Sequence, residues 1–134
     1  MPAPVKVVLV VDDEPGMRDM LRWYLGECGF EMKTARDGEE AVEVLSAGPV
    51  DLVITDLTMP RLNGFALLDA IGARRPRPPV IVITGFGTVE MAVLAMRRGA
   101  SDLLLKPFDA QHLLRRIQEV LAEATAVPSG EKPA

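Results

Sequence analysis

The sequence predicts an α/β fold in which five parallel strands form one sheet and helices cover both of its faces. Strand-like apolar runs alternate with segments of helical spacing five times along the 134 residues, and parallel strands need such crossover helices between them. Three of the runs are continuously apolar, as central strands are, while one alternates with polar residues, as an edge strand does. The predicted architecture is therefore a doubly wound, flavodoxin-like (βα)5 sheet with the strand order 2-1-3-4-5.

The first half of the chain contains two of the five strand–helix units. Residues 5–11 are nearly all apolar and β-branched, which indicates a buried strand, and residues 30–35 alternate, which indicates the edge strand. The helix between them is expected to end at Gly29. Its core positions recur at helical spacing: Met17, Met20, Leu21, Tyr24, Leu25 and Cys28. After the second strand, Asp37 is placed to cap a helix and Glu40 to complete a capping box.

The second half of the chain continues the alternation with three more units. Strands are expected at residues 50–55, 80–83 and 101–105. The helix between the first two of these strands presents one apolar face: Phe65, Leu68 and Ile71. Asp109 can cap the last helix. The apolar positions of that helix are Leu113, Leu114, Ile117, Val120 and Leu121.

The fourth helix differs from the others because it is apolar on more than one side. Its core face is predicted to consist of Val89, Ala92, Val93 and Met96. A second apolar face is then left with Met91, Leu94 and Ala95. A helix of this kind is either deeply buried or meets a partner, so this helix is interpreted as part of an output surface.

Length and composition favour one compact domain at residues 1–126, followed by a disordered tail or the start of a linker at residues 127–134. The net charge of −4 argues against direct nucleic-acid contact, because phosphate backbones attract basic patches. Cys28 is the only cysteine, which excludes an internal disulfide and a multi-cysteine zinc site. The chain shows no signal peptide and no apolar run of membrane-spanning length, so we expect a cytoplasmic protein without a membrane partner.

Polar residues of related chemistry stand where four of the predicted strands end. Asp12 and Asp13 follow the first strand, Asp56 ends the third, Thr84 the fourth and Lys106 the fifth. Each of them alone is a common turn or cap residue. Because the carboxyl ends of parallel strands share one edge of the sheet, where ligands bind, we expect the five side chains to meet at one site.

These side chains have the chemistry that phosphoryl transfer requires. Three carboxylates close together repel one another, and a hard divalent cation such as Mg²⁺ is the usual way to neutralise them. Lys106 adds a positive charge and Thr84 a hydroxyl donor, so the set can neutralise and position a transferring phosphoryl group. A carboxylate in such a setting can act as a nucleophile and form an aspartyl phosphate.

Four segments resemble the receiver domains of bacterial two-component response regulators. They are VLVVDDEP at residues 8–15, DLVITDLTMPRLNG at 51–64, VIVITGFG at 80–87 and GASDLLLKPF at 99–108. The resemblance extends over nearly the whole chain and implies a domain that receives a phosphoryl group from a sensor histidine kinase. The stretch TGFGTVEMAVLAMRRGASD also resembles receivers of transcriptional activators, which implies a role in transcription regulation.

The resemblance implies that Asp56 is the phosphoacceptor. It also implies a Mg²⁺ (or Mn²⁺) ion held by Asp12, Asp13, Asp56 and the backbone carbonyl of Thr58. Since Asp56 itself is modified, the chain is not expected to be an enzyme in the ordinary sense.

The resemblance further implies how the switch operates. Thr84 is the hydroxyl that reaches for the phosphoryl oxygen, and Lys106, before a cis bond to Pro107, is its charge partner. Leu103 departs from the family, which usually carries an aromatic residue there that turns inward on activation, and Phe86 stands where the family tunes access of water to the phosphoryl group. The family often dimerises on activation through its fourth helix, fifth strand and fifth helix, so we expect a phosphorylation-dependent homodimer through that surface.

Three alternatives share the fold or the site. A flavin or nucleotide carrier needs a Gly-rich phosphate loop after the first strand, where this chain has the acidic sequence DDEPG. A Mg²⁺-dependent phosphatase with an aspartate nucleophile needs a second acid two residues after Asp56, where Thr58 stands. A receiver that only docks partners is the third alternative, and the complete set of site residues argues against it.

Overall fold

The computed structural model describes residues 4–57, 63–85 and 88–126. Five parallel strands form one sheet in the order β2-β1-β3-β4-β5, which confirms the predicted fold class and strand order. The strands are β1 (Val7–Val11), β2 (Glu31–Ala35), β3 (Leu52–Asp56), β4 (Val80–Thr84) and β5 (Asp102–Leu105). The helices are α1 (Pro15–Glu27), α2 (Gly38–Ala47), α3 (Gly64–Gly72), α4 (Val89–Arg97) and α5 (Ala110–Ala126). None of the described helices is long and apolar enough to span a membrane.

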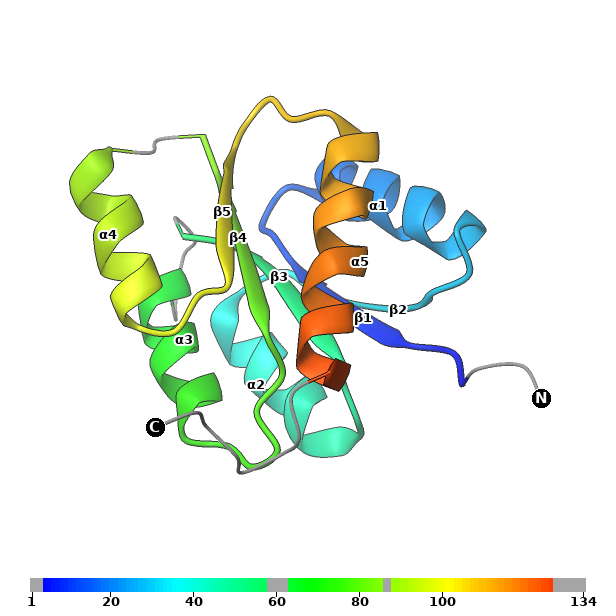
Figure 1. Cartoon of the computed structure of the whole chain (residues 1–134), viewed down its shortest axis with the longest axis horizontal. Coiled ribbons are helices and arrows are strands. Elements are labelled where there is room, and N and C mark those ends of the chain that lie inside the picture. Colours follow the sequence, from blue (N-terminus) through cyan, green and yellow to red (C-terminus); the bar gives the residue numbers. More distant parts are fainter. Residues whose placement is uncertain (1–3, 58–62, 86–87, 127–134) are drawn as a thin grey trace.

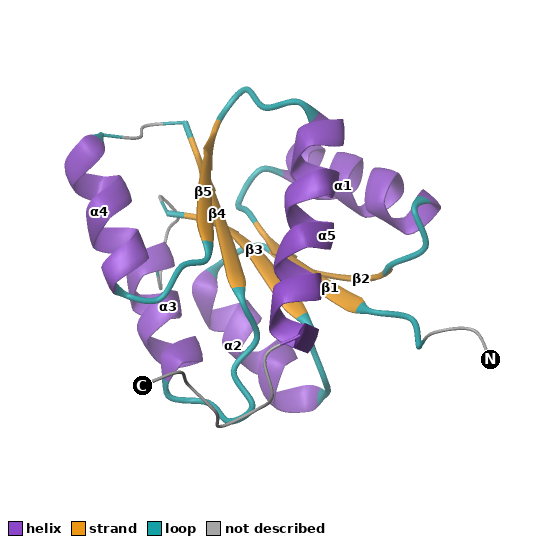
Figure 2. Cartoon of the chain, in the orientation of Figure 1, coloured by secondary structure: helices purple, strands orange, loops and turns teal. Residues whose placement is uncertain are grey.

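The sheet lies between two layers of helices (Figures 1 and 2). On one face, α1 and α5 pack through four fully buried side chains: Leu21, Leu25, Leu113 and Ile117. On the other face, α2, α3 and α4 pack through a second cluster that includes Ala41, Leu45, Leu67, Leu68, Ile71 and Ala95. Alternate residues of β1 serve the two clusters, Val8 and Val10 the first and Leu9 and Val11 the second, because successive strand side chains point to opposite faces.

Burial along the strands follows the predicted distinction between centre and edge. Every residue of β1, β3 and β4 is buried, whereas Ala35 alone is buried in β2. A strand covered by helices on both faces must be apolar throughout, while an edge strand exposes alternate residues to water. The apolar pattern therefore predicted correctly which strands occupy the middle of the sheet.

The predicted cap of α2 is present with one small difference. Asp37 accepts a hydrogen bond from the backbone N–H of Glu40 at 2.9 Å, as an N-cap does. The Glu40 carboxylate accepts from the backbone N–H of Arg36 at 2.8 Å, one residue before the cap position that a capping box uses. The beginning of α2 is thus determined by these two local acidic side chains.

Several predicted core positions are wrong. Met20 of α1 is 39% exposed rather than buried. Cys28 is also exposed, because it follows the last residue of α1 and its backbone N–H caps the helix end. On α4, Ala95 is buried and Met91 packs against the core, whereas Val89, Val93 and Met96 of the predicted core face are exposed. Periodicity alone did not distinguish the two apolar faces, and the small Ala95 side chain is the one that lets α4 approach the sheet closely.

Gly64 allows α3 to begin directly against the end of β3. A Cβ atom at this position would lie 2.7 Å from Cα of Leu57 and would also overlap the backbone oxygen of Asp56. The backbone N–H of Gly64 donates to the carbonyl of Leu57 at 3.1 Å. Because the obstructing atoms belong to the backbone, they cannot move aside as a flexible side chain would.

The substitution Gly64→Ala is expected to lower the free energy of unfolding by about 1–3 kcal/mol, as overpacking against fixed atoms does. Gly72→Ala is the control, because a Cβ at this other end of α3 meets nothing within 4 Å and alanine favours a helix. Urea unfolding of both variants measures the difference. Equal stability of the two variants would show that the end of β3 has room for a side chain.

Candidate functional site

Four of the five predicted site residues have buried or nearly buried side chains at the carboxyl edge of the sheet. Asp12 follows β1, Asp56 and Thr84 end β3 and β4, and Lys106 follows β5. Asp12 and Thr84 are completely buried, and Asp56 is 6% exposed. Burying charged side chains is unfavourable unless they are paired and hydrogen-bonded, so their partners define the site.

The Lys106 ammonium group joins the two buried carboxylates. Its Nζ donates to Oδ2 of Asp56 at 2.8 Å and to Oδ2 of Asp12 at 3.0 Å, and it lies 3.5 Å from Oε1 of Glu14. The backbone N–H of Lys106 also donates to the carbonyl of Thr84 at 2.8 Å, which fixes its position beside β4. The bond from Lys106 to Pro107 is cis, as the resemblance implied. One cation thereby connects the ends of β1, β3 and β5.

Burial shifts the protonation equilibria of this pair in a definite way. Burial raises the pKa of the Asp12 carboxyl, and the negative charge of Asp56 adds to that rise. The backbone N–H of Glu14, which donates to Oδ1 of Asp12 at 2.9 Å, and the Lys106 ammonium oppose it. Burial alone would lower the pKa of Lys106, but its hydrogen bonds to Asp56 and Asp12 outweigh burial and raise the pKa above its usual value. Lys106 therefore stays protonated at neutral pH.

Asp13 completes a cluster of three carboxylates. Asp12, Asp13 and Asp56 each offer one carboxylate oxygen, and these oxygens lie within 4.8 Å of one another. Asp13 is exposed while the other two are buried, so the cluster opens to solvent on the side of Asp13. Hard oxygen donors at such spacing suit Mg²⁺ or Mn²⁺, which keep several water ligands. The donor set therefore fits the metal that was predicted for this edge.

The remaining predicted positions differ in what can be said of them. The backbone carbonyl of Thr58 and the side chain of Phe86 lie outside the described residues. Gly85 follows Thr84 directly, and a Cβ built on it would meet no atom within 4 Å among the described residues, its two chain neighbours left aside. Leu103 is half-buried in β5 and packs against the cluster that contains Ala95 of α4.

Two residues at the site were not predicted from the sequence. Glu14 lies near Lys106, and Arg18 donates from Nη1 to the carbonyl of Asp12 at 2.7 Å. Glu14 is the third acid of the run that begins at Asp12, which is a visible signal. Arg18 lies one helical turn after Glu14, whose backbone carbonyl accepts from the N–H of Arg18, and its position in the sequence does not separate it from an ordinary exposed cation.

Comparison with known proteins gives a consistent result. A family model described as the response regulator receiver domain matches residues 8–118. The response regulator protein PilR of Pseudomonas aeruginosa is 38% identical over 92% of this chain and 27% of its own length. The nitrogen assimilation regulatory protein NtrX of Azorhizobium caulinodans is 38% identical over 80% of this chain and 24% of its own length. The chain thus spans about a quarter of these curated relatives.

Solved structures agree with the sequence comparisons. A response regulator receiver domain protein from Clostridium thermocellum has a TM-score of 0.84 and 33% identity over 90% of this chain and 98% of its own. The receiver domain of NtrX from Brucella abortus has a TM-score of 0.80 and 40% identity over 86% of this chain and 98% of its own.

Replacing Lys106 with methionine is expected to lower the free energy of unfolding by about 3 kcal/mol, because it leaves two buried carboxylates without their cation. Lys33→Met is the control, since the hydrogen bond that Lys33 makes within the described part of the chain is an exposed one to the carbonyl of Pro49. Urea unfolding in EDTA, which prevents a metal from replacing the ammonium, measures the loss. A loss in Lys106→Met no larger than in the control would contradict the assigned bridging role.

Proposed function

Because this chain belongs to the response regulator receiver domain family, we propose that it is a switch controlled by phosphorylation of Asp56. The observation that carries the proposal is the contact of Asp56 with Lys106 at the carboxyl edge, beside Asp12, Asp13 and Thr84. Asp56 is nearly buried, but the cluster opens to solvent at Asp13, so a phosphoryl donor can approach it. From the chain's membership of this family, we take the phosphoryl donor to be a phosphohistidine on a sensor histidine kinase.

In the proposed transfer, a carboxylate oxygen of Asp56 attacks the phosphorus atom of the phosphohistidine. The new P–O bond forms as the P–N bond breaks, and the released imidazole takes up a proton from solvent. Lys106 neutralises charge on the phosphoryl oxygens, which it can do from its present position 2.8 Å from Oδ2 of Asp56. The reacting atoms need little covalent help beyond positioning and charge neutralisation.

A bound Mg²⁺ or Mn²⁺ would neutralise further negative charge on the transferring group. Asp12, Asp13 and Asp56 would hold it, and the backbone carbonyl of Thr58 is proposed as a further ligand. The metal and Lys106 would both face Asp56. Their positive charges would offset the repulsion between the negatively charged phosphoryl group and the carboxylates of Asp12 and Asp13.

Modification of Asp56 adds negative charge between Lys106 and the end of β4. Thr84 is the last residue of β4, and α4 begins five residues later at Val89. A hydroxyl that moves toward the phosphoryl group would therefore move the start of the segment that leads into α4. Such a local change can shift α4 between two conformations, although the site itself does not contact the surface that responds. The modified group is the chain's own Asp56, so we do not class the chain as an enzyme.

The surface that responds is proposed to be α4 with β5 and α5. The exposed apolar side chains of α4 and β5 are Val89, Val93, Leu94, Met96 and Leu105. Three of the α4 side chains line a shallow hollow of about 410 Å³ together with Glu90 and Arg97. Apolar side chains gathered on one exposed face favour association with a second copy of the same surface.

The curated relatives suggest the output. PilR, NtrX and the transcriptional regulatory protein GlrR of Escherichia coli, which is 37% identical over 87% of this chain, are regulators about four times the length matched. We infer that this receiver controls transcription through sequence outside the matched region rather than through its own contact with nucleic acid. Its cytoplasmic location stays a prediction.

Incubation with acetyl phosphate and Mg²⁺ is expected to add one phosphoryl group to the wild-type chain. Asp56→Asn should add none, because the amide is not a nucleophile of this kind, and the wild type in EDTA should add none. Asp19→Asn is the matched control, since Asp19 is an exposed carboxylate on α1 that pairs with the exposed Arg22. Intact mass spectrometry measures each sample. Modification of Asp56→Asn to the wild-type extent would contradict the proposal.

Phosphorylation is also expected to shift the chain from monomer toward dimer in sedimentation velocity. Val93→Asp should abolish the shift, because a charge on the exposed face of α4 opposes apolar association. Met20→Asp is the control, since Met20 is similarly exposed on α1, in the other helical layer. A fully phosphorylated wild type that sediments as an unchanged monomer would exclude the dimer.

A further inference from the structure

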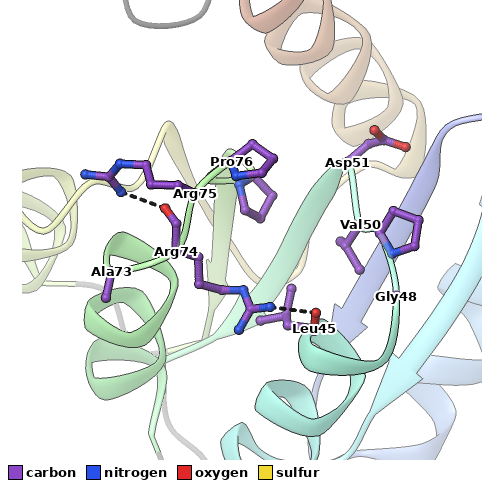
Figure 3. A pocket seen from close by; sticks show the side chains of 10 residues that line it. Leu45, Gly48, Val50, Asp51, Ala73, Arg74, Arg75 and Pro76 are labelled. Carbon is purple, nitrogen blue, oxygen red and sulfur yellow. Dashed lines mark hydrogen bonds between the residues drawn. The ribbon is translucent and has the colours of Figure 1, made fainter.

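A groove lies at the amino edge of the sheet, on the opposite side of the molecule from Asp56. Its main hollow has a volume of about 580 Å³ and lies where α2 and α3 end and β3 and β4 begin (Figure 3). A second hollow of about 230 Å³ continues toward α5 and Lys6. The two hollows share four lining residues: Val50, Asp51, Pro76 and Pro78. We call them together the amino-edge groove.

The walls of the amino-edge groove combine apolar side chains with charged groups that are mainly positive. Its apolar side chains include Leu45, Val50, Pro76, Pro78 and Leu121. The cations are Lys6, Arg74, Arg75 and Arg77, against the single carboxylate of Asp51. Asp51 already accepts a hydrogen bond from the backbone N–H of Val7 at 2.7 Å. A surplus of cations in a chain of net charge −4 favours an occupant that carries negative charge.

The two arginines that line the main hollow are held in place by helix ends. Nη2 of Arg74 donates to the carbonyl of Leu45 at 2.8 Å, near the end of α2. Nη1 of Arg75 donates to the carbonyl of Gly72, the last residue of α3, at 2.9 Å. Figure 3 shows Arg74 and Arg75 extending in different directions from the same turn. A guanidinium has five N–H donors. Each arginine can therefore bind a carboxylate and still keep its hydrogen bond to the carbonyl at the helix end.

The chain itself continues from α5 at this edge. The last turn of α5 contributes Ala124 to the second hollow, and α5 ends at Ala126. Residues 127–134 follow with the sequence VPSGEKPA. Pro128 has no backbone N–H to donate to a preceding turn of helix. Eight residues reach up to about 26 Å when extended, which is enough to run along both hollows.

The chemistry of this segment suits both hollows, because each of them combines apolar side chains with cations. Val127 and Pro128 come first and are apolar, as is the part of the second hollow beside Leu121. Glu131 is the only acidic side chain of the segment and comes five residues after Ala126. Leu121 and Ala124 of α5 line the second hollow, whereas Arg74 and Arg75 line the main hollow.

We propose that residues 127–134 bind in the amino-edge groove, with Val127 and Pro128 beside Leu121 and with the Glu131 carboxylate on Arg75. The segment would then hold whatever follows α5 against the sheet edge opposite the phosphoacceptor site. This inference is independent of phosphorylation, because none of its contacts involves Asp56 or its neighbours.

A spin label on the segment tests the proposal in the full chain. The label is attached at Ser129→Cys in a Cys28→Ser background, since Cys28 is exposed and is the only native thiol. Amide signals of Gly48, Asp51 and Ala73 are expected to broaden severalfold more than that of Gly29, which lies at the same edge of the sheet between α1 and β2 but outside the groove. Equal broadening at Gly29 and at the three groove residues would overturn the proposal.

Charge variants test the ion pair within the same experiment. Glu131→Arg should reduce the broadening at Ala73, and the double variant Glu131→Arg with Arg75→Glu should restore it. Lys132→Gln is the matched control in the neighbouring residue and should leave the broadening unchanged. Undiminished broadening in Glu131→Arg would refute the contact of Glu131 with Arg75.

A mixed sample separates this chain's own segment from that of a second copy. Labelled chains without ¹⁵N are mixed with unlabelled ¹⁵N chains, so that only contacts between molecules broaden the signals. No broadening at Asp51 and Ala73 is expected in the mixture. Broadening as strong as in the single-chain sample would assign the groove to a second copy and overturn the proposal.

Discussion

The ammonium group of Lys106 holds the site together, because it compensates two buried carboxylates that come from different strands. Asp12 and Asp56 both accept from Nζ of Lys106, at 3.0 and 2.8 Å. Without that cation the two carboxylates, which are buried or nearly buried, would repel each other. The parallel sheet makes the arrangement available, since it brings the ends of β1, β3 and β5 to one edge. A phosphoryl group on Asp56 would enter this balance of charge directly.

The same topology separates charge between the two edges of the sheet. Asp12, Asp13, Glu14 and Asp56 gather at the carboxyl edge, while the amino-edge groove carries four cations and one carboxylate. Helices that connect parallel strands end at the amino edge, where cations bind the last carbonyl groups favourably. Arg74 and Arg75 do so at α2 and α3. One edge is therefore suited to a metal and a phosphoryl group, and the other to a carboxylate.

The sequence was sufficient to predict the strand order and the meeting of Asp12, Asp56 and Lys106. Continuous apolar runs occur in strands covered on both faces, and a parallel sheet aligns their ends whatever their separation in the sequence. The core face of α4 was predicted wrongly, because its two apolar stripes have the same period and only packing selects Ala95. Cys28 has helical spacing but lies beyond the last turn of α1. The contact of Arg18 with Asp12 and the amino-edge groove depend on distances between side chains of different segments, which no local pattern contains.

The nitrogen resonance of the Lys106 ammonium tests most directly the claim that this group responds to modification of Asp56. Protein labelled with ¹⁵N on lysine side chains would be followed by NMR at neutral pH while acetyl phosphate and Mg²⁺ are added. One slowly exchanging ammonium signal of Lys106 is expected to lose intensity at its first position and to gain it at a second position in proportion to the phosphorylated fraction, while the signal of Lys33 stays in place. A Lys106 signal that is unchanged at full phosphorylation would contradict it, because the ammonium would then not face the modified group.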